Sequence, residues 1–296
     1  MALAVPTRDG ELNYYDLSAS RAESPKIYFV NGIRVLGRDH ALTASLISLL
    51  AEHPVQGIYN RTAGSVSGLV FDVAQCALDY MEIVRARVSK GRALTPDRKI
   101  PDSELPKLVD EVLKKSAVWN QATARLFKEL ILNRNTMKYI VAHSQGNLIT
   151  SNALFAMEHV LGSASLNKVR VYSLASPAPA WPMGLRRNKG GGGRQENAFM
   201  NDMVALLRPH NLAAKVGVDR FQNAGDFRTD EDSWKVSLSP HDTNKNIALN
   251  FLKSIRNDLG NVKEIGPDFL KECIKKADLA IPKTKRTFWQ WLDDTF

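Results

Sequence analysis

Short apolar runs alternate with longer stretches of helical periodicity along most of the chain. The runs are rich in β-branched and aromatic residues and are bounded by turn residues, which predicts buried strands. Four of them are 26–30, 55–59, 137–142 and 169–174. Strands that alternate with helices favour a mostly parallel central sheet with helices on both of its faces. The sequence therefore predicts the α/β fold class.

Apolar residues that recur every three or four positions predict the helices between these strands. They cover about 42–50, 66–88, 108–115, 118–132 and 149–160, with Ser116 as a candidate N-cap. An edge strand at 11–17, strands at 198–200 and 234–238, and a helix around 248–259 complete the pattern. Polar, glycine-rich or proline-rich segments predict loops at 91–106, 181–194 and 206–232. The first and last of these loops are the candidates for a lid.

The length suits one large domain with a short appendage. The chain has 296 residues, of which 44% are hydrophobic, so it can bury a sizeable core. We expect residues 1–260 to form the α/β domain. Residues 261–296 are expected to form a helical, aromatic and basic appendage that packs on it, since they are too few for a domain of their own.

The net charge is +9, and the basic residues are spread along the chain with mild clusters at 85–92, 186–194 and 283–286. A solvated basic surface is the first interpretation, and peripheral contact with an anionic membrane is the second. No nucleic-acid motif is present, so no nucleic-acid partner is expected. The sequence leaves the oligomeric state open.

Cys76 and Cys273 lie far apart, which predicts buried free thiols rather than metal ligands. We expect neither a metal nor a cofactor. Residues 1–10 lack a basic stretch followed by an apolar core, so no cleavable secretory signal is expected. No apolar run approaches the roughly 20 residues that span a bilayer. These features predict a cytoplasmic protein, or one exported without a cleavable signal peptide.

The most informative motif follows the predicted strand 137–142. The sequence there reads Ala142-His143-Ser144-Gln145-Gly146, and a helical pattern begins at once. A strand–turn–helix of this kind holds a serine out of its sheet, with an exposed hydroxyl and with the next backbone N–H free to bind an oxyanion. Ser144 is therefore the candidate nucleophile, with alanine at the position where this motif usually has its first glycine.

A serine nucleophile needs a base to take its proton and an acid to orient that base. Asp202 ends the strand predicted at 198–200, and His241 follows the strand predicted at 234–238. Both would lie at the carboxyl edge of the sheet, where open α/β folds bind their ligands. Asp202 and His241 are therefore the candidate acid and base.

Other acids and histidines compete for these roles. Asp242 adjoins His241 and is badly placed to orient its ring, and the side chain of His143 should point away from Ser144. The irregular segment 206–232 holds Asp226, Asp230, Asp232 and His210. The predicted helices carry His40, His53 and His159, which we interpret as surface or packing residues.

An oxyanion hole needs two backbone donors. One is expected from Gln145, at the N-terminus of the helix after Ser144, where the helix dipole favours negative charge. The second is expected from the turn after the strand 26–30, which reads Asn31-Gly32-Ile33. Gly32 lets the chain turn there, and either Gly32 or Ile33 can donate.

These segments together resemble the α/β-hydrolase superfamily, in its lipase-like branch. The matching pieces are IYFVNGI (27–33), YIVAHSQGNLI (139–149), VYSLASPAP (171–179), MNDMVALL (200–207) and SPHDTNKNI (239–247). The resemblance implies an α/β-hydrolase fold in which Ser144 attacks an ester carbonyl, His241 shuttles the proton and Asp202 orients His241. Water then hydrolyses the acyl-enzyme. The chain departs from the family at Ala142 and in having no His-Gly pair in the oxyanion loop.

The resemblance implies a hydrolase of carboxylic esters. The segment 283–292 places Phe288, Trp289 and Trp291 beside basic residues, which favours a lipid or phospholipid substrate, although the segment equally fits a tail that covers an apolar groove of its own domain. We therefore expect a lipase or phospholipase. Bacterial lipase effectors that act on neighbouring cells share such a core, and the resemblance permits that role. The open alternatives are a thioesterase or acyltransferase, and a non-catalytic binding protein on the same fold.

Overall fold

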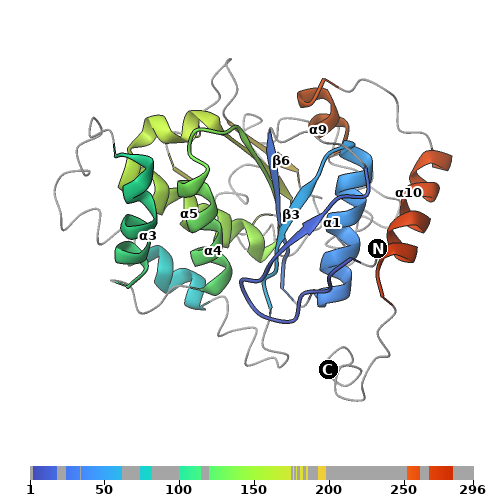
Figure 1. Ribbon diagram of the computed structural model, residues 1–296, viewed down its shortest axis with the longest axis horizontal. Coiled ribbons are helices and arrows are strands. Elements are labelled where there is room, and N and C mark those ends of the chain that lie inside the picture. Colours follow the sequence, from blue (N-terminus) through green and yellow to red (C-terminus); the bar gives the residue numbers. More distant parts are fainter. Residues whose placement is uncertain are drawn as a thin grey trace, which may run out of the picture.

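The protein has a central sheet with helices packed on both faces (Figure 1). The computed structural model describes residues 3–18, 25–33, 35–61, 74–81, 100–114, 120–174, 176, 178, 181–182, 185, 193–197, 252–260 and 267–282. Within these ranges helices and strands alternate, and most strands run parallel. The predicted α/β class is confirmed.

In the part of the chain that the structure describes, the sheet has six strands in the order β1-β3-β2-β4-β5-β6. They are β1 (Leu12–Tyr15), β2 (Lys26–Val30), β3 (Val55–Ile58), β4 (Lys138–His143), β5 (Val169–Leu174) and β6 (Gly193–Asn197). β1 pairs antiparallel with β3, and every other neighbouring pair is parallel. The central strands are apolar almost throughout because helices cover both of their faces.

Within the described residues, helices lie between β2 and β5 along the chain, and two more follow β6. The first group is α1 (Gly37–Ala51), the helical residues 74–81, α3 (Leu105–Lys114), α4 (Gln121–Leu132) and α5 (Gln145–Leu161), and the helices after β6 are α9 (Leu252–Asp258) and α10 (Pro267–Ala280). Two short 3-10 turns, η1 (Asp102–Glu104) and η2 (Ser163–Lys168), precede α3 and β5. In Figure 1, α1 and α10 lie on one side of the sheet, and α3, α4 and α5 lie on the other.

Alternation along the strands divides the core into two layers. Ile27 and Phe29 of β2 pack with α1, α9 and α10, whereas Tyr28 and Val30 pack with α4 and α5. Cys76 lies in the second layer and Cys273 in the first, and both are buried free thiols as predicted. The alternate residues of one strand thus hold helices from distant parts of the chain on opposite faces.

The strand order reverses between β2 and β4. From β2 the chain passes through α1 to β3 on one side, and from β4 it passes through α5 to β5 on the other. Since α1 and α5 cover opposite faces, the turns after β2 and β4 leave the sheet in different directions. Open α/β sheets bind ligands in the crevice at such a reversal, outside the carboxyl ends of the strands. Ser144 follows β4 at this point.

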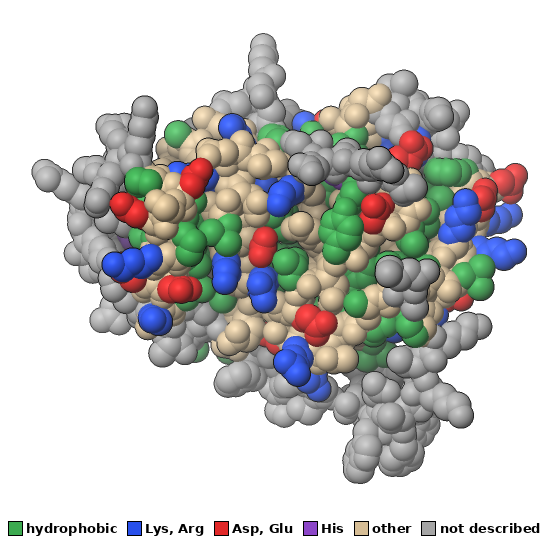
Figure 2. All heavy atoms as spheres, viewed as in Figure 1, with side chains coloured by type: hydrophobic (Ala, Val, Ile, Leu, Met, Phe, Trp, Pro, Cys, Tyr) green, Lys and Arg blue, Asp and Glu red, His purple; other side chains and the backbone are tan. Residues whose placement is uncertain are grey.

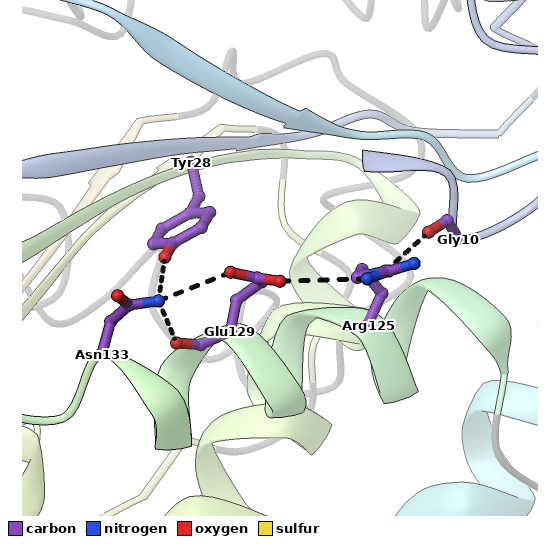
Figure 3. Close-up of polar contacts among 5 residues, drawn as sticks. All are labelled: Gly10, Tyr28, Arg125, Glu129 and Asn133. Carbon is purple, nitrogen blue, oxygen red and sulfur yellow. Dashed lines mark hydrogen bonds and ion pairs between the residues drawn. The ribbon is translucent and has the colours of Figure 1, made fainter. Parts of the chain in front are cut away.

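Polar side chains fix the end of α4 to β2 (Figure 3), and Lys138 of β4 bonds to the turn that follows α4. The Asn133 amide donates to the Tyr28 hydroxyl at 3.2 Å and to the Glu129 carbonyl at 2.9 Å. The Lys138 ammonium donates to three backbone carbonyls of the turn before β4, at 2.6 to 3.3 Å. Burial lowers the pKa of Lys138 to about 8, so it remains charged at neutral pH. We call Tyr28, Glu129, Asn133 and Lys138 the α4 clamp.

Several predicted boundaries need correction. Strand β6 starts at Gly193, inside the loop predicted at 181–194, whereas the strand expected at 198–200 lies outside the described residues. Helix α3 starts at Leu105, inside the loop predicted at 91–106, with Pro106 in a first turn that needs no amide donor. Helix α4 is capped by Asn120, whose side chain accepts from the Thr123 N–H. The expected N-cap Ser116 lies outside the described residues.

Other predictions fall partly or wholly outside the described residues. Of the helix predicted at 66–88, residues 74–81 are described and are helical. The strand expected at 234–238 and the segment 206–232 are not among them. From the C-terminal part, α10 packs on α1 and contributes Cys273 and Ala277 to the core. None of the helices in the described ranges is long and apolar enough to cross a membrane.

Candidate active site

Ser144 stands in a strained backbone conformation between β4 and α5. Its φ of 51° and ψ of −124° lie outside the regions that residues with a side chain normally occupy. Such a conformation costs on the order of 1–3 kcal/mol and persists only where the surroundings enforce it. β4 ends at His143 and α5 begins at Gln145, so a single residue makes the whole turn. The predicted strand–turn–helix around Ser144 is present.

Hydrogen bonds from β5 and α5 hold this turn. The Ser144 N–H donates to the Leu174 carbonyl at 3.0 Å, which continues the β4–β5 pairing by one residue. The Asn147 side-chain amide donates to the Leu174 carbonyl at 2.8 Å and to the Ser144 carbonyl at 3.1 Å. The Asn147 backbone N–H also donates to the Ser144 carbonyl, at 2.9 Å. The first turn of α5 thus supports the strained residue.

Two glycines let the turn after β2 lie directly against Ser144. A Cβ added to Gly32 would lie 2.6 Å from the Ser144 Cβ, and one added to Gly146 would lie 2.3 Å from the Val30 carbonyl oxygen. Neither position has room for a side chain. Ala142, by contrast, is fully buried within β4 between β2 and β5, so the strand accommodates its methyl group.

Ser144 is only 1% exposed. This differs from the expected exposed hydroxyl, and the close approach of Gly32 contributes to the burial because it brings the chain after β2 against the serine. His143 is also buried, and a Cβ added to Gly32 would lie 2.9 Å from its Nδ1. The turn is therefore closely packed.

A buried network of side-chain amides surrounds the turn after β2. The Asn31 amide donates to the carbonyls of Gly32 and Asn60, both at 2.8 Å. Its oxygen accepts from the Asn60 N–H at 2.8 Å and faces the His40 Nδ1 at 2.8 Å. The Asn60 amide then donates to the Gln145 side-chain oxygen at 2.8 Å. We call Asn31, His40, Asn60 and Gln145 the amide cradle.

His40 is neutral and acts as a donor in this network. It is fully buried, stacks on Phe29 with ring centroids 5.1 Å apart, and fills the space that Gly57 leaves open. Burial lowers the pKa of His40 to about 3, and the charge of Glu11 opposes this shift. Since the Asn31 oxygen can only accept, the His40 proton lies on Nδ1. The interpretation of His40 as a packing residue is confirmed, with a hydrogen bond in addition.

The backbone around Ser144 offers donors for an anion. Gln145 begins α5, and the first N–H groups of a helix have no acceptor within the helix. Gly32 and Ile33 lie on the neighbouring turn after β2. Among the described residues the Ile33 N–H has no hydrogen-bond partner. A hydroxyl flanked by a helix N-terminus and a second turn is suited to nucleophilic attack with oxyanion stabilisation.

The structure brings together four of the predicted site residues: Ser144, Gln145, Gly32 and Ile33. The candidate acid Asp202 and the candidate base His241 lie outside the described residues. So do the competitors Asp226, Asp230, Asp232, Asp242 and His210. His53 follows α1 and is buried, and His159 lies on α5 far along from its N-terminus. Within the described ranges no group of three or more His, Cys, Asp or Glu could hold a metal ion.

Sequence reasoning missed Asn60 and Asn147, and it gave Asn31 no role of its own. The available signal was position, because Asn31 and Asn60 follow the buried strands β2 and β3, which are neighbours in the sheet. Polar residues at adjoining carboxyl ends of parallel strands are expected to meet. Asn147 lies three residues after Ser144, the spacing of a side chain that reaches back to the start of its helix.

Comparison with protein-family models, curated proteins and solved structures gave no match for this chain.

Proposed function

We propose that the protein is a serine hydrolase of carboxylic esters with an α/β-hydrolase fold, in which Ser144 is the nucleophile. The observation that carries the proposal is the backbone of Ser144, strained at φ 51° between a parallel strand and a helix N-terminus. Strain of this size is retained where a site uses it. A nucleophile held on such a turn meets its substrate at the carboxyl edge of the sheet.

The reversal of strand order supports the same assignment. It puts the turn after β2 next to the turn after β4, so a second backbone donor can face the anion that forms at Ser144. In the proposed reaction the Ser144 oxygen bonds to the ester carbonyl carbon while His241 takes its proton, and Asp202 orients His241. The alcohol leaves with that proton, and water then releases the acid.

Lipid or phospholipid esters are the proposed substrates, and an anionic membrane surface is the proposed place of contact. The support is the net charge of +9 and the aromatic, basic segment 283–292. On the face shown in Figure 2, acidic and basic side chains of the described residues are interspersed, so this face is not predominantly basic. Helix α10 exposes Phe269, Ile274 and Leu279 and carries three lysines and three carboxylates.

The test is hydrolysis of a chain-length series of p-nitrophenyl esters, phospholipid vesicles and acyl thioesters by the purified full chain. We expect acid release that Ser144→Ala reduces at least about 10³-fold, since the nucleophile supplies most of the acceleration. Product analysis separates hydrolysis from acyl transfer. Faster turnover of vesicles than of soluble esters would support the lipid assignment, and slower turnover would count against it.

The matched control is Ser173→Ala. Ser173 is a fully buried serine on β5, and it pairs with Ala142 in the sheet. We expect this variant to keep the activity of the natural protein. Equal hydrolysis by Ser144→Ala and the natural protein would overturn the assignment of Ser144 as nucleophile, and no hydrolysis by either would leave a binding role on this fold.

A further inference from the structure

We propose that Asn31 is a positioning residue for the oxyanion hole. Its side-chain amide orients the Gly32–Ile33 peptide so that the Ile33 N–H is the second donor, and Asn60 ties this peptide to Gln145, which provides the first. The inference rests on the proposed function of Ser144. It selects between Gly32 and Ile33, which the sequence left open.

The Asn31 side chain uses all of its hydrogen-bonding capacity inside the protein. Its two N–H groups donate to the Gly32 and Asn60 carbonyls, and its oxygen accepts from the Asn60 N–H and the His40 ring. An amide has two donors and two acceptor sites, so none is left over. Asn31 is fully buried, which makes each of these bonds costly to break. Its role is therefore to hold neighbouring backbone in place.

The bond to Gly32 decides which N–H can serve the site. In a trans peptide the C=O and the following N–H point in opposite directions. The Gly32 carbonyl points to the Asn31 amide at 2.8 Å, so the Ile33 N–H points away from that buried amide. The Asn31 carbonyl oxygen lies toward α5, 2.9 Å from a Cβ added to Gly146, so the Gly32 N–H points away from α5. The Ile33 N–H remains as the donor.

Glycine makes this tie necessary. Gly32 must lack a side chain because its Cα lies against Ser144. A glycine is also the residue whose backbone rotates most freely, so nothing intrinsic fixes the peptide that follows it. The Asn31 amide supplies the missing restraint from the preceding residue.

Asn60 carries the restraint to the second donor. Its backbone N–H and carbonyl hold the Asn31 side chain, and its own amide donates to the Gln145 side chain at 2.8 Å. The Gln145 amide reaches the Cys76 sulfur at 3.6 Å, and Gln145 is 2% exposed. The turn after β2 and the start of α5 are therefore joined through one buried path. Holding two donors at a fixed separation is what an oxyanion hole requires.

The experiment compares Asn31→Ala and Asn60→Ala with Asn133→Ala in the full chain. Asn133 is the matched control, because its amide also donates to a backbone carbonyl and to a second side chain, but in the α4 clamp. For Asn31→Ala and Asn60→Ala we expect kcat on a p-nitrophenyl ester to fall about 10- to 100-fold with KM changed less than about threefold, since losing one oxyanion donor costs about 10²–10³. Asn133→Ala should keep kcat.

A second readout is the ratio of kcat/KM on an ester and on the matching thionoester, whose sulfur accepts hydrogen bonds poorly. We expect the preference for the oxygen ester to fall in Asn31→Ala and Asn60→Ala and to stay constant in Asn133→Ala. A purely structural role would lower Tm in all three and leave this ratio unchanged, which would overturn the inference.

If Asn31→Ala does not fold, Asn60→Ala and Gln145→Ala test the inference in its place. Both variants keep the hydrogen bonds between the Asn60 backbone and the Asn31 side chain. Unchanged kcat and an unchanged ester preference in both variants would overturn the inference. If the natural protein itself hydrolyses no ester through Ser144, the proposed function fails and the inference fails with it. If the natural protein is active but the variants match Asn133→Ala, the inference alone fails.

Discussion

The amide cradle and the α4 clamp lie at opposite ends of β4 and use similar side-chain chemistry. In the clamp, the Asn133 amide and the Lys138 ammonium satisfy carbonyls where α4 ends, a task that most helix ends require. In the cradle, Asn31 and Asn60 hold backbone that belongs to no helix or strand. The α4 clamp thus completes the end of a helix, whereas the amide cradle holds turns outside the helices and strands.

The two clusters differ in the backbone conformation beside them. Next to the clamp β4 begins as an ordinary strand, whereas next to the cradle it ends at Ser144 with a positive φ. Breaking the clamp should therefore reduce stability, and breaking the cradle should alter the geometry around Ser144. Variants in the two clusters can therefore be compared within one protein.

The largest effect is expected from Gly146→Ala, on the cradle side. The new methyl carbon would lie 2.3 Å from the Val30 carbonyl oxygen, and two backbone segments would have to separate. We expect a loss of about 4 kcal/mol or more in the free energy of unfolding, as for other severe packing defects. Urea unfolding followed by circular dichroism measures it.

Gly260→Ala is the control for adding a methyl group at a glycine. Its φ of 76° is unfavourable for alanine, but nothing lies within 4 Å of the added carbon. The expected cost is about 1–2 kcal/mol, from the left-handed backbone alone. Equal losses in the two variants would contradict the close approach of α5 to β2.

The next largest effect is a pH dependence from His40. Burial lowers its pKa to about 3 in the folded protein, whereas an unfolded chain has about 6.5. The unfolded state therefore binds a proton between these values and the folded state does not. Stability is full above about pH 6.5 and falls as the pH drops, by on the order of 3 kcal/mol at pH 4.

His40→Phe isolates this contribution, because phenylalanine keeps the ring contact with Phe29 and cannot titrate. Unfolding free energies of both proteins between pH 7 and pH 4 give the comparison. We expect the variant to be less stable at pH 7 but to lose less stability on acidification. Parallel curves would show that the pKa of His40 in the folded protein is close to its unfolded value, which would contradict this account.

The smallest effect belongs to the α4 clamp. Asn133→Ala removes hydrogen bonds to the Tyr28 hydroxyl and the Glu129 carbonyl at a partly buried site. Each such bond contributes about 1 kcal/mol, so the free energy of unfolding should fall by about 1–2 kcal/mol. Thermal unfolding at pH 7 measures it. A loss as large as that of Gly146→Ala would contradict the expected difference in stability between the two regions.

Sequence periodicity predicted the central strands and α1, α4 and α5 because each has one dominant pattern. Lys26–Val30 and Val169–Leu174 were predicted to the residue, since apolar β-branched and aromatic residues fill them. The start of β6 at Gly193 was missed because glycines at a strand start look like a loop. Residues with no pattern of their own, such as those after β2, take their conformation from tertiary contacts.

The candidate site was predictable to the extent that it is local. Ser144 and Gln145 lie within one strand–turn–helix, so the sequence identified them directly. The pairing of Asn31 with Asn60 and of Asn60 with Gln145 joins residues 29 and 85 positions apart. Only the strand order brings these side chains together, and the sequence does not state that order. The burial of Ser144 depends on the same long-range packing.

Covalent labelling of Ser144 tests the central claim most directly. The full chain is treated with a fluorophosphonate, digested and mapped by mass spectrometry, beside Ser144→Ala and the Ser173→Ala control. We predict one adduct, on Ser144, in the natural protein and in Ser173→Ala, and none in Ser144→Ala. A natural protein that stays unlabelled, or an adduct that persists in Ser144→Ala, would contradict the account.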